Sequence, residues 1–366
     1  MAHAVPPGTT PLLDLDEAWA VGAPGPRLRA VRRAAERLRD RFAAGPRAVA
    51  VRTLPLVVTP YPTKYALFGA ALSPAPFVLL SHRCLLVQFL QAGELRTLLF
   101  NPTDVDGARA TPYFARLAAG IPGPVQRALA PTPEPLVDQL AHLGVAPEDV
   151  DYVAHDHLHV QDLRPIVGTV DGRVSARFPC ATLVASQTEW NDWDDLHPLQ
   201  RAWYVRDGKL GVRLDQVTLT TGDVLLGDGV MLVRTPGHTS GNQTLFVNTD
   251  SGVWGVSENG TCADSWAPMD SRIPGLRALA RRQELDLVLN ANTPERGADQ
   301  YTSMILERTV VDRVKRAPAF VQMLPSSEIT PSALSPGLKP TILHRSISHG
   351  RLSAVTPRRP RSRAAE

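Results

Sequence analysis

Strand-like stretches fall into two groups along the chain, and this grouping is the strongest constraint on the fold. The first group lies at 49–58, 77–89 and from residue 95 onward; the second lies at 181–186, 217–238, 244–259 and 285–292. Helical patterns at 135–143 and 274–283 are interspersed between them. Strands grouped in this way predict an α+β fold, an αββα sandwich of two mixed β-sheets with helices on the outer faces.

Composition indicates an ordinary globular protein, because the 366 residues are 43% hydrophobic and 20% charged. The first residues lack a basic and apolar leader, and no segment has the apolar length of a membrane span, so a cytoplasmic location is expected. Three widely separated cysteines without a CxxC pair predict neither a disulfide framework nor a thiolate zinc cluster. A net charge of only +3 and no RNA-binding motif argue against a nucleic-acid partner.

Three segments are expected along the chain. Residues 1–46 form an N-terminal extension with an amphipathic helix, whose apolar stripe runs through Leu28, Val31, Ala35, Leu38 and Phe42. Residues 47–317 contain the strand groups and form the main domain. Residues 318–366 end in the basic run RRPRSR and are expected to be a flexible tail.

The stretch HDHLHVQD, residues 155–162, places three imidazoles and two carboxylates directly after an apolar strand at 150–154. Side chains two apart on an extended backbone point the same way, so either His155 with His157 or His157 with His159 could bind one ion. The chain needs a residue or two to leave the sheet, which favours His157 and His159. Loops that follow strands are where layered proteins tend to place chemistry.

A third imidazole is available in TPGHTSG, where Pro236 and Gly237 bend the chain after a strand and present His238. Three neutral imidazoles with an open fourth position are a recognised zinc arrangement that lowers the pKa of bound water to about 7. The alternative is structural: the imidazoles and Asp162 could form a hydrogen-bonded polar network that closes the ends of the sheet.

The order of these motifs resembles the metallo-β-lactamase fold superfamily. A helix is followed by EDVDYV, HxHxxD, TPGHTSGNQTL and a strand that ends in an acidic residue, and the resemblance covers residues 49–316. It implies that the main domain is metallo-β-lactamase-like and that His157, His159 and His238 match the imidazoles of the family's first metal site.

The second metal site of the family is not matched. Gln161 stands at the position of the family's Asp, Asp162 at that of the adjacent His, Glu258 at that of the bridging Asp and Asn292 at that of the last His. Amide side chains are poor zinc ligands. The resemblance therefore implies one ion rather than two, Zn²⁺ with Fe or Mn as alternatives, held by the three histidines with Asp162 or Glu258 in support.

The resemblance also implies an activity. In the usual mechanism of the family, a metal-bound hydroxide attacks a carbonyl or phosphoryl centre, so we expect a metal-dependent hydrolase of a small-molecule ester, lactone or thioester. Asp162 and Glu258 would be the catalytic carboxylates that orient the nucleophile. The alternative is a non-catalytic or ligand-binding descendant of the fold with a degenerate metal site. Nothing in the sequence indicates an oligomeric state.

Several further residues near these motifs have two interpretations each. Asp156 could orient a ligand imidazole or cap a turn, Asp104 could shape the site, Asn259 could position water, and Asp264 could replace Glu258. The tryptophans of EWNDWDDLHPLQRAWY (189–204) could pack a helical insertion or form an aromatic lid. Surface or packing roles are expected for His82, His142 and His197.

Overall fold

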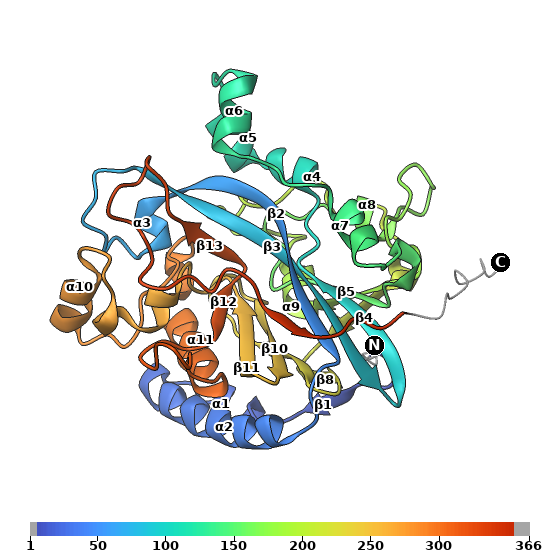
Figure 1. Cartoon of the computed structure of the whole chain (residues 1–366), viewed down its shortest axis with the longest axis horizontal. Helices are drawn as coiled ribbons and strands as arrows, with labels where there is room; N and C mark the ends of the chain where they lie inside the picture. Colours follow the sequence, from blue (N-terminus) through green and yellow to red (C-terminus); the bar gives the residue numbers. More distant parts are fainter. Residues whose placement is uncertain (1–5, 355–366) are drawn as a thin grey trace.

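Two mixed β-sheets pack face to face in the structure, a computed structural model that describes residues 6–354 (Figure 1). The six-stranded sheet has the spatial order β1 (Thr10–Leu12), β8 (Asp223–Gly227), β9 (Val230–Arg234), β10 (Gln243–Thr249), β11 (Gly252–Ser257) and β12 (Met323–Pro325). The eight-stranded sheet has the order β14 (Ser348–Gly350), β2 (Ala50–Pro62), β3 (Phe77–Gln91), β4 (Glu94–Phe100), β5 (Tyr152–Ala154), β6 (Thr182–Ser186) and β7 (Val217–Thr220), and β13 (Ser327–Thr330) pairs with β3.

Strand direction changes within the eight-stranded sheet, and this change positions the site. β2, β3 and β4 are antiparallel neighbours, whereas β4, β5, β6 and β7 run parallel. The carboxyl ends of parallel strands lie at one edge of a sheet. The loops that follow β4, β5 and β6 therefore emerge together, and HDHLHVQD is the loop that follows β5.

Alternating side chains on the strands build separate apolar layers. Leu85, Val87 and Phe89 of β3 point into the core between the sheets, while Leu86 points to the outer face. The same alternation places Leu232 of β9 between the sheets and its neighbours on the opposite face. Burial of each such side chain contributes about 1.5–3 kcal/mol, so the period of two is what fixes the register of each strand.

Helices cover both outer faces of the sandwich, as the αββα prediction requires. α2 (Pro24–Ala44) and α11 (Gly297–Val310) pack together on the six-stranded sheet, and α7 (Leu136–His142) packs on the eight-stranded sheet. The remaining helices are α1 (Asp16–Trp19), α3 (Thr63–Ala66), α4 (Val105–Arg109), α5 (Pro112–Ala118), α6 (Gly123–Leu129), α8 (Arg164–Val167), α9 (Gln187–Asp192) and α10 (Leu276–Gln283). The predicted fold class is confirmed.

The N-terminal extension is integrated with the sandwich. The expected amphipathic helix is α2, and it buries Val31, Ala35, Leu38 and Phe42 of the predicted stripe against the six-stranded sheet. The preceding strand β1 pairs with β8 at the edge of that sheet. Residues 6–46 therefore contribute both a strand and a covering helix to the main fold.

The prediction of a flexible tail from residue 318 is wrong for the part of the tail that the structure describes. β12 lies parallel to β11, β13 pairs with β3, and β14 pairs with β2, so this segment crosses both sheets (Figure 1). Its basic, proline-rich composition concealed short strands that depend on strands far away in the sequence. The run RRPRSR lies outside the described residues.

The segment 285–292, expected as a strand, forms none. Its residues Leu287 and Val288 are buried, but its backbone N–H groups donate to carbonyls outside the sheets, Val288 to Ser265 in a 3-10 helix and Asn290 to Asn259 in a loop. Burial alone thus produced the strand-like pattern. Within residues 6–354, no helix is both long and apolar enough to cross a membrane.

Candidate metal centre

The ligand-bearing loops follow β5 and β9, one strand from each sheet. HDHLHVQD begins directly after Ala154 at the end of β5, and His238 follows the end of β9 at Arg234. Val160 has φ of 57°, a left-handed conformation that is unfavourable for a β-branched residue. Its N–H donates to the Trp203 carbonyl at 2.8 Å, which holds this conformation. Such strain is concentrated at functional sites in proteins.

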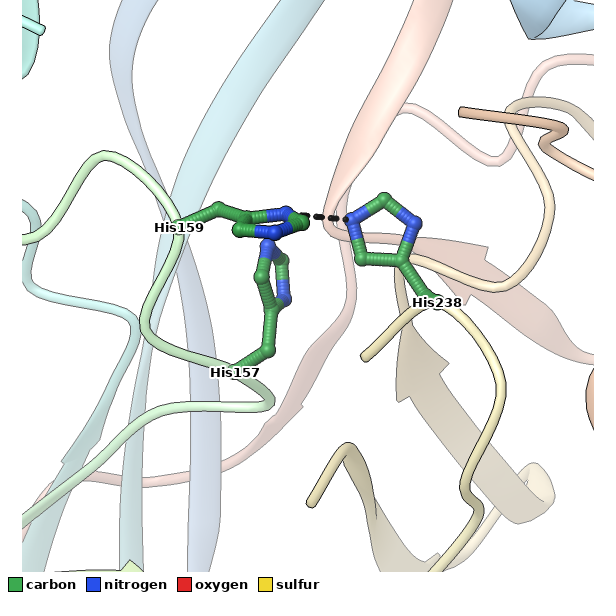
Figure 2. A group of neighbouring side chains, drawn as sticks. All are labelled: His157, His159 and His238. Atoms are coloured by element: carbon green, nitrogen blue, oxygen red, sulfur yellow. Dashed lines mark hydrogen bonds between the residues drawn. The ribbon is translucent and has the colours of Figure 1, made fainter. Parts of the chain in front are cut away.

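Three imidazoles converge where these loops meet (Figure 2). His157, His159 and His238 each offer a ring nitrogen, and the three nitrogens lie within 4.8 Å of one another. The rings are buried, and their centroids are 4.4–5.1 Å apart at steep angles. Among residues 6–354 this is the one group of histidine, cysteine or acidic side chains close enough to bind a metal ion.

Hydrogen bonds on the outer side of the His159 ring determine which of its nitrogens faces inward. Gln200 donates its amide N–H to Glu295 at 2.8 Å, so its carbonyl oxygen faces His159 and accepts from Nε2 at 2.8 Å. The lone pair of a neutral His159 is therefore on Nδ1, which lies 3.3 Å from Nε2 of His238. Two ring nitrogens this close need a shared proton or a cation between them.

The other rings are held in similar ways. Asp156 places Oδ1 2.8 Å from Nδ1 of His157, and Asn290 lies 3.5 Å from Nδ1 of His238. Nε2 is the inward nitrogen of both rings. The Asp156 carboxylate favours a proton on Nδ1 of His157, which turns the Nε2 lone pair inward, as acceptors beside ligand imidazoles do in many metal sites. Asn290 instead presents its amide N–H to His238, because its oxygen accepts from Tyr61, so it packs against this ring without fixing the tautomer that binds metal. The donor set thus fits zinc, which prefers neutral imidazoles.

Charge at the site is uneven in the metal-free protein. Burial, followed by the nearby His157, lowers the pKa of both His159 and His238 well below the ordinary value. Burial also opposes protonation of His157, but Asp156 and the carboxylates of Glu258 and Glu189 outweigh it and raise its pKa. His159 and His238 are therefore neutral at pH 7, the form in which imidazole binds metal.

The carboxylate of Asp156 is the main anion beside the imidazoles. Burial opposes its ionisation, but His157 and the hydrogen bonds from His157 and Ser326 lower the pKa of Asp156 to about 2. Its backbone is also fixed, because its N–H donates to Asn101 Oδ1 at 3.0 Å. Of the two roles considered for Asp156, the structure favours the one beside an imidazole, because its Oδ1 lies 2.8 Å from Nδ1 of His157.

The two predicted supporting carboxylates lie beyond the imidazole group. Asp162 is engaged elsewhere, because Arg164 donates to it from Nε at 2.8 Å, from the terminal nitrogen at 2.6 Å and from the backbone. Glu258 is buried close to His157, and burial, with Asp156 adding to it, raises the pKa of Glu258 to about 8. Neither joins the nitrogens that lie within 4.8 Å of one another in the part of the chain that the structure describes.

Gln161 and Asn292, the two amide residues that stand where the family has Asp and His, each contact another side chain. Gln161 donates to Thr103 Oγ1 at 2.9 Å, and its buried carbonyl oxygen has no partner among the described residues. Asn292 accepts from Thr293 at 3.3 Å. Asn290, which sequence reasoning did not single out, is the asparagine that contacts His238, and it also accepts from Tyr61 at 2.8 Å.

Other predicted residues lie in supporting positions. Asp104 caps α4 by accepting from Gly107 and also accepts from Arg177 at 2.7 Å. Asn259 accepts from the His238 N–H at 3.2 Å, whereas Asp264 is bonded to Ser271 and Thr341, away from the imidazoles. His155 is buried, and neither of its ring nitrogens has a hydrogen-bond partner among the described residues.

Aromatic side chains border the site on the side of His159. The ring of Trp203 lies 6.2 Å from that of His159, and Tyr113 of α5 stacks on Trp203 at 4.2 Å. Trp193 packs on Tyr204 instead, and Trp190 lies beneath the Lys209 ammonium. The insertion at 189–204 therefore both packs a structural unit and contributes one ring to the wall of the site.

Sequence reasoning missed the buried side chains that hold the loops. Glu189 and Gln200 contact the ligand loop of β5 across 31 and 41 residues, and Glu307 supports Asn259 across 48 residues. A buried carboxylate within a helix has no local pattern that distinguishes it from an exposed one. The acidic EWNDWDD run was the one indication that this segment was unusual.

Comparisons with known proteins found similar curated sequences and several solved structures of similar fold. No protein-family model matches the chain. The chain is 32% identical over 121 residues to the N-acyl homoserine lactonase AttM of Rhizobium radiobacter, a match covering 30% of this chain and 41% of that protein. The chain thus matches less than half of the length of that relative.

Two solved structures are similar to the chain at lower sequence identity. A probable metal-dependent hydrolase from Staphylococcus aureus has 14% identity and a TM-score of 0.48, covering 69% of this chain and 82% of that one. AidC, a dizinc quorum-quenching lactonase, has 11% identity and a TM-score of 0.45, covering 77% of this chain and 94% of that one.

The predicted resemblance to the metallo-β-lactamase superfamily is confirmed at the level of the fold. The layer order, the directions of the strands and the meeting of the three imidazoles at the strand ends are those that the motifs implied. The same scaffold hosts many reactions, so the activity is a separate question.

Proposed function

We propose that the chain is a metal-dependent hydrolase of a small-molecule ester, lactone or thioester, with lactones the first class to test. The observation that supports this most is the set of three inward ring nitrogens within 4.8 Å, each on a ring whose outer nitrogen contacts another side chain. Lactones come first because the AttM relative is an N-acyl homoserine lactonase.

One Zn²⁺ ion is the proposed cofactor, with Fe and Mn as alternatives. His157, His159 and His238 would hold it, with His157 releasing its proton on binding, and imidazole nitrogens suit zinc. Such an ion supplies a Lewis acid that polarises a carbonyl oxygen and lowers the pKa of water. A second tightly held ion is not proposed, because Asp162 is paired with Arg164 and amides occupy two further positions.

Glu258 is the proposed catalytic carboxylate. It is buried beside His157, and its raised pKa of about 8 places its proton exchange near neutral pH. A carboxyl group in that range can hold a proton or release it at its oxygen as charge develops on a substrate. Asp162, by contrast, is proposed to hold the ligand loop through Arg164 rather than to act on substrate.

The wall formed by Trp203 and Tyr113 would exclude water from the imidazoles and offer an apolar surface to the substrate. Trp203 lies over His159, and Tyr113 belongs to α5, a helix with no buried residues. The hydrocarbon chain of an acyl group is apolar and could pack against these two rings.

Hydrolysis assays on zinc-loaded protein test the proposal. An N-acyl homoserine lactone, a phenyl ester and an acyl thioester are compared by proton release or absorbance, with the His238→Ala variant as the control. We expect turnover of at least one substrate at about 1 s⁻¹ or faster, lost in the control. A fully zinc-loaded protein inactive on all three would contradict the proposal.

The rival function is a non-catalytic, ligand-binding protein with a degenerate site. It is favoured by the 3.3 Å contact between His159 and His238, which a shared proton can satisfy without metal. Under that alternative, protein purified without chelator contains little metal, and His157→Ala leaves ligand binding unchanged. Elemental analysis of wild-type protein separates the two.

A further inference from the structure

One buried carboxylate connects the two loops that carry the imidazoles. Glu189 lies in α9 and is 1% exposed. Its Oε1 accepts from the N–H of Leu158, the residue between His157 and His159, at 2.9 Å. Its Oε2 accepts from the N–H of Gly241, in the loop of His238, at 3.2 Å.

A third hydrogen bond joins this carboxylate to Tyr204, whose ring packs against His159. Tyr204 donates its hydroxyl to Oε1 of Glu189 at 2.7 Å. The ring of Tyr204 packs edge-on against His159 with centroids 4.9 Å apart. Glu189 thus contacts the neighbours of all three imidazoles without contacting an imidazole through any hydrogen bond.

The loop of His238 is fitted closely around this residue. A Cβ atom added to Gly241 would lie 2.2 Å from the backbone nitrogen of Glu189 and 2.5 Å from its Cβ. Only glycine allows such an approach. The absence of a side chain at residue 241 therefore lets α9 approach the loop closely enough for the carboxylate to reach its N–H.

We propose that Glu189 is a positioning residue of the metal centre, which sets the separation of the two ligand loops and thereby the affinity for the ion. The inference rests on the proposed function, because it assumes that the imidazoles bind metal. Partners that orient metal ligands from the next layer commonly change affinity about 10- to 100-fold when removed.

The pattern of donors around the carboxylate makes Glu189→Gln a selective probe. Two donors, Leu158 N–H and Tyr204 O–H, meet at Oε1, so the amide oxygen of a glutamine occupies that position. Its NH₂ group then faces the Gly241 N–H, and two donors oppose each other. The substitution keeps the link to the His157–His159 loop and breaks the link to the His238 loop.

The measurement is the zinc dissociation constant of the stripped full-length chain, obtained by competition with a chelator. We expect Glu189→Gln to raise it at least about tenfold. Tyr204→Phe removes one donor but leaves both loop contacts, so its dissociation constant should stay within about threefold of wild type. Glu189→Asp keeps the charge on a shorter side chain and should give an intermediate loss, which covers the case in which Glu189→Gln fails to fold.

Asp264→Asn is the matched control for destabilisation. Asp264 is an equally buried carboxylate, but it is bonded to Ser271 and Thr341 away from both loops. The Asp264→Asn substitution should lower the melting temperature of the stripped protein without weakening zinc binding. If folded Glu189 variants bind zinc as tightly as wild type, the role of Glu189 is overturned and the proposed function is not. A wild-type chain that binds no zinc would overturn it together with the proposed function, and one that binds zinc without hydrolysis would leave it standing.

Discussion

The two halves of the ligand loop after β5 differ in how their side chains are used. In the first half, His157 and His159 have their outer nitrogens next to Asp156 and Gln200, and their inner nitrogens face His238. In the second half, Gln161 and Asp162 are directed to Thr103 and Arg164. The first half directs its ring nitrogens to one point, whereas in the second half Asp162 is held by Arg164 and Gln161 keeps a carbonyl oxygen without a partner among the described residues.

This difference explains why a single ion is the better proposal. A ligand must be deprotonated, correctly oriented and free of competing partners. His159 and His238 are neutral at pH 7, and His157, whose pKa is raised, has to release a proton when an ion binds. Asp162 would have to give up a bidentate contact with Arg164 that is worth more than an exposed ion pair.

Removal of one imidazole should abolish metal binding. His157→Ala leaves only two nitrogens, so zinc content should fall from about one to below about 0.1 equivalents per chain. His142→Ala is the matched control, because His142 is exposed on α7. Elemental analysis after gel filtration measures both variants. Full zinc content in His157→Ala would remove His157 from the ligand set.

Substitution of Glu258 should separate catalysis from metal binding. Glu258→Gln retains the shape and burial of the side chain but cannot exchange a proton, so turnover should fall about 100-fold with zinc content near that of wild type. Steady-state rates and elemental analysis on the same samples check this. A loss of zinc that matches the loss of turnover would instead make Glu258 a ligand.

Glu307, which supports the loop of His238 through Asn259, should make the free energy of unfolding depend on pH. Glu307 accepts from Asn259, Thr244 and Trp266, and burial, although opposed by these bonds, raises the pKa of Glu307 to about 7 from 4.5. A raised carboxyl pKa means that the folded state binds the proton more tightly. Its contribution is therefore complete below about pH 4.5 and is lost as pH rises toward 7, by about 3 kcal/mol in total.

Urea unfolding of stripped wild type and Glu307→Gln at pH 5 and pH 8 tests this dependence. The stability gained by the variant relative to wild type should be larger at pH 8, because the glutamine never ionises. An equal difference at both values would show that Glu307 has the same charge in the folded and unfolded states across this range.

The smallest effect is expected in the second half of the ligand loop. Asp162→Asn loses the ion pair with Arg164 and should lower the free energy of unfolding by about 1–2 kcal/mol. Zinc affinity should change less than about threefold, because the amide still accepts from Arg164 and no imidazole depends on it. Chemical unfolding and chelator competition measure the two quantities. Zinc binding reduced as strongly as in His157→Ala would restore Asp162 as a ligand.

Local patterns were sufficient to predict β2, β3 and β9, the helices α2 and α7, and the three histidines that meet at the strand ends. The alternation in β3 and β9 and the two-residue spacing of His157 and His159 are properties of short segments. The motifs also located His238, because Pro236 and Gly237 end a strand beside it. These features do not depend on residues far away in the chain.

Long-range support could not be predicted in the same way. Glu189 contacts Leu158 from 31 residues away, and Gln200 and Asn290 contact His159 and His238 from 41 and 52 residues away. Each resembles an ordinary polar residue in its own segment. The strands β12 to β14 were missed for a related reason. They are short, and their stability comes from pairing with β11, β3 and β2 rather than from their own composition.

The three imidazoles are proposed to form a site for one metal ion. The metal content of protein purified without added metal and then incubated with zinc, determined by elemental analysis, tests this most directly. We expect about one tightly held equivalent per chain, removed by His238→Ala. Less than about 0.2 equivalents after incubation, or full content in His238→Ala, would contradict it.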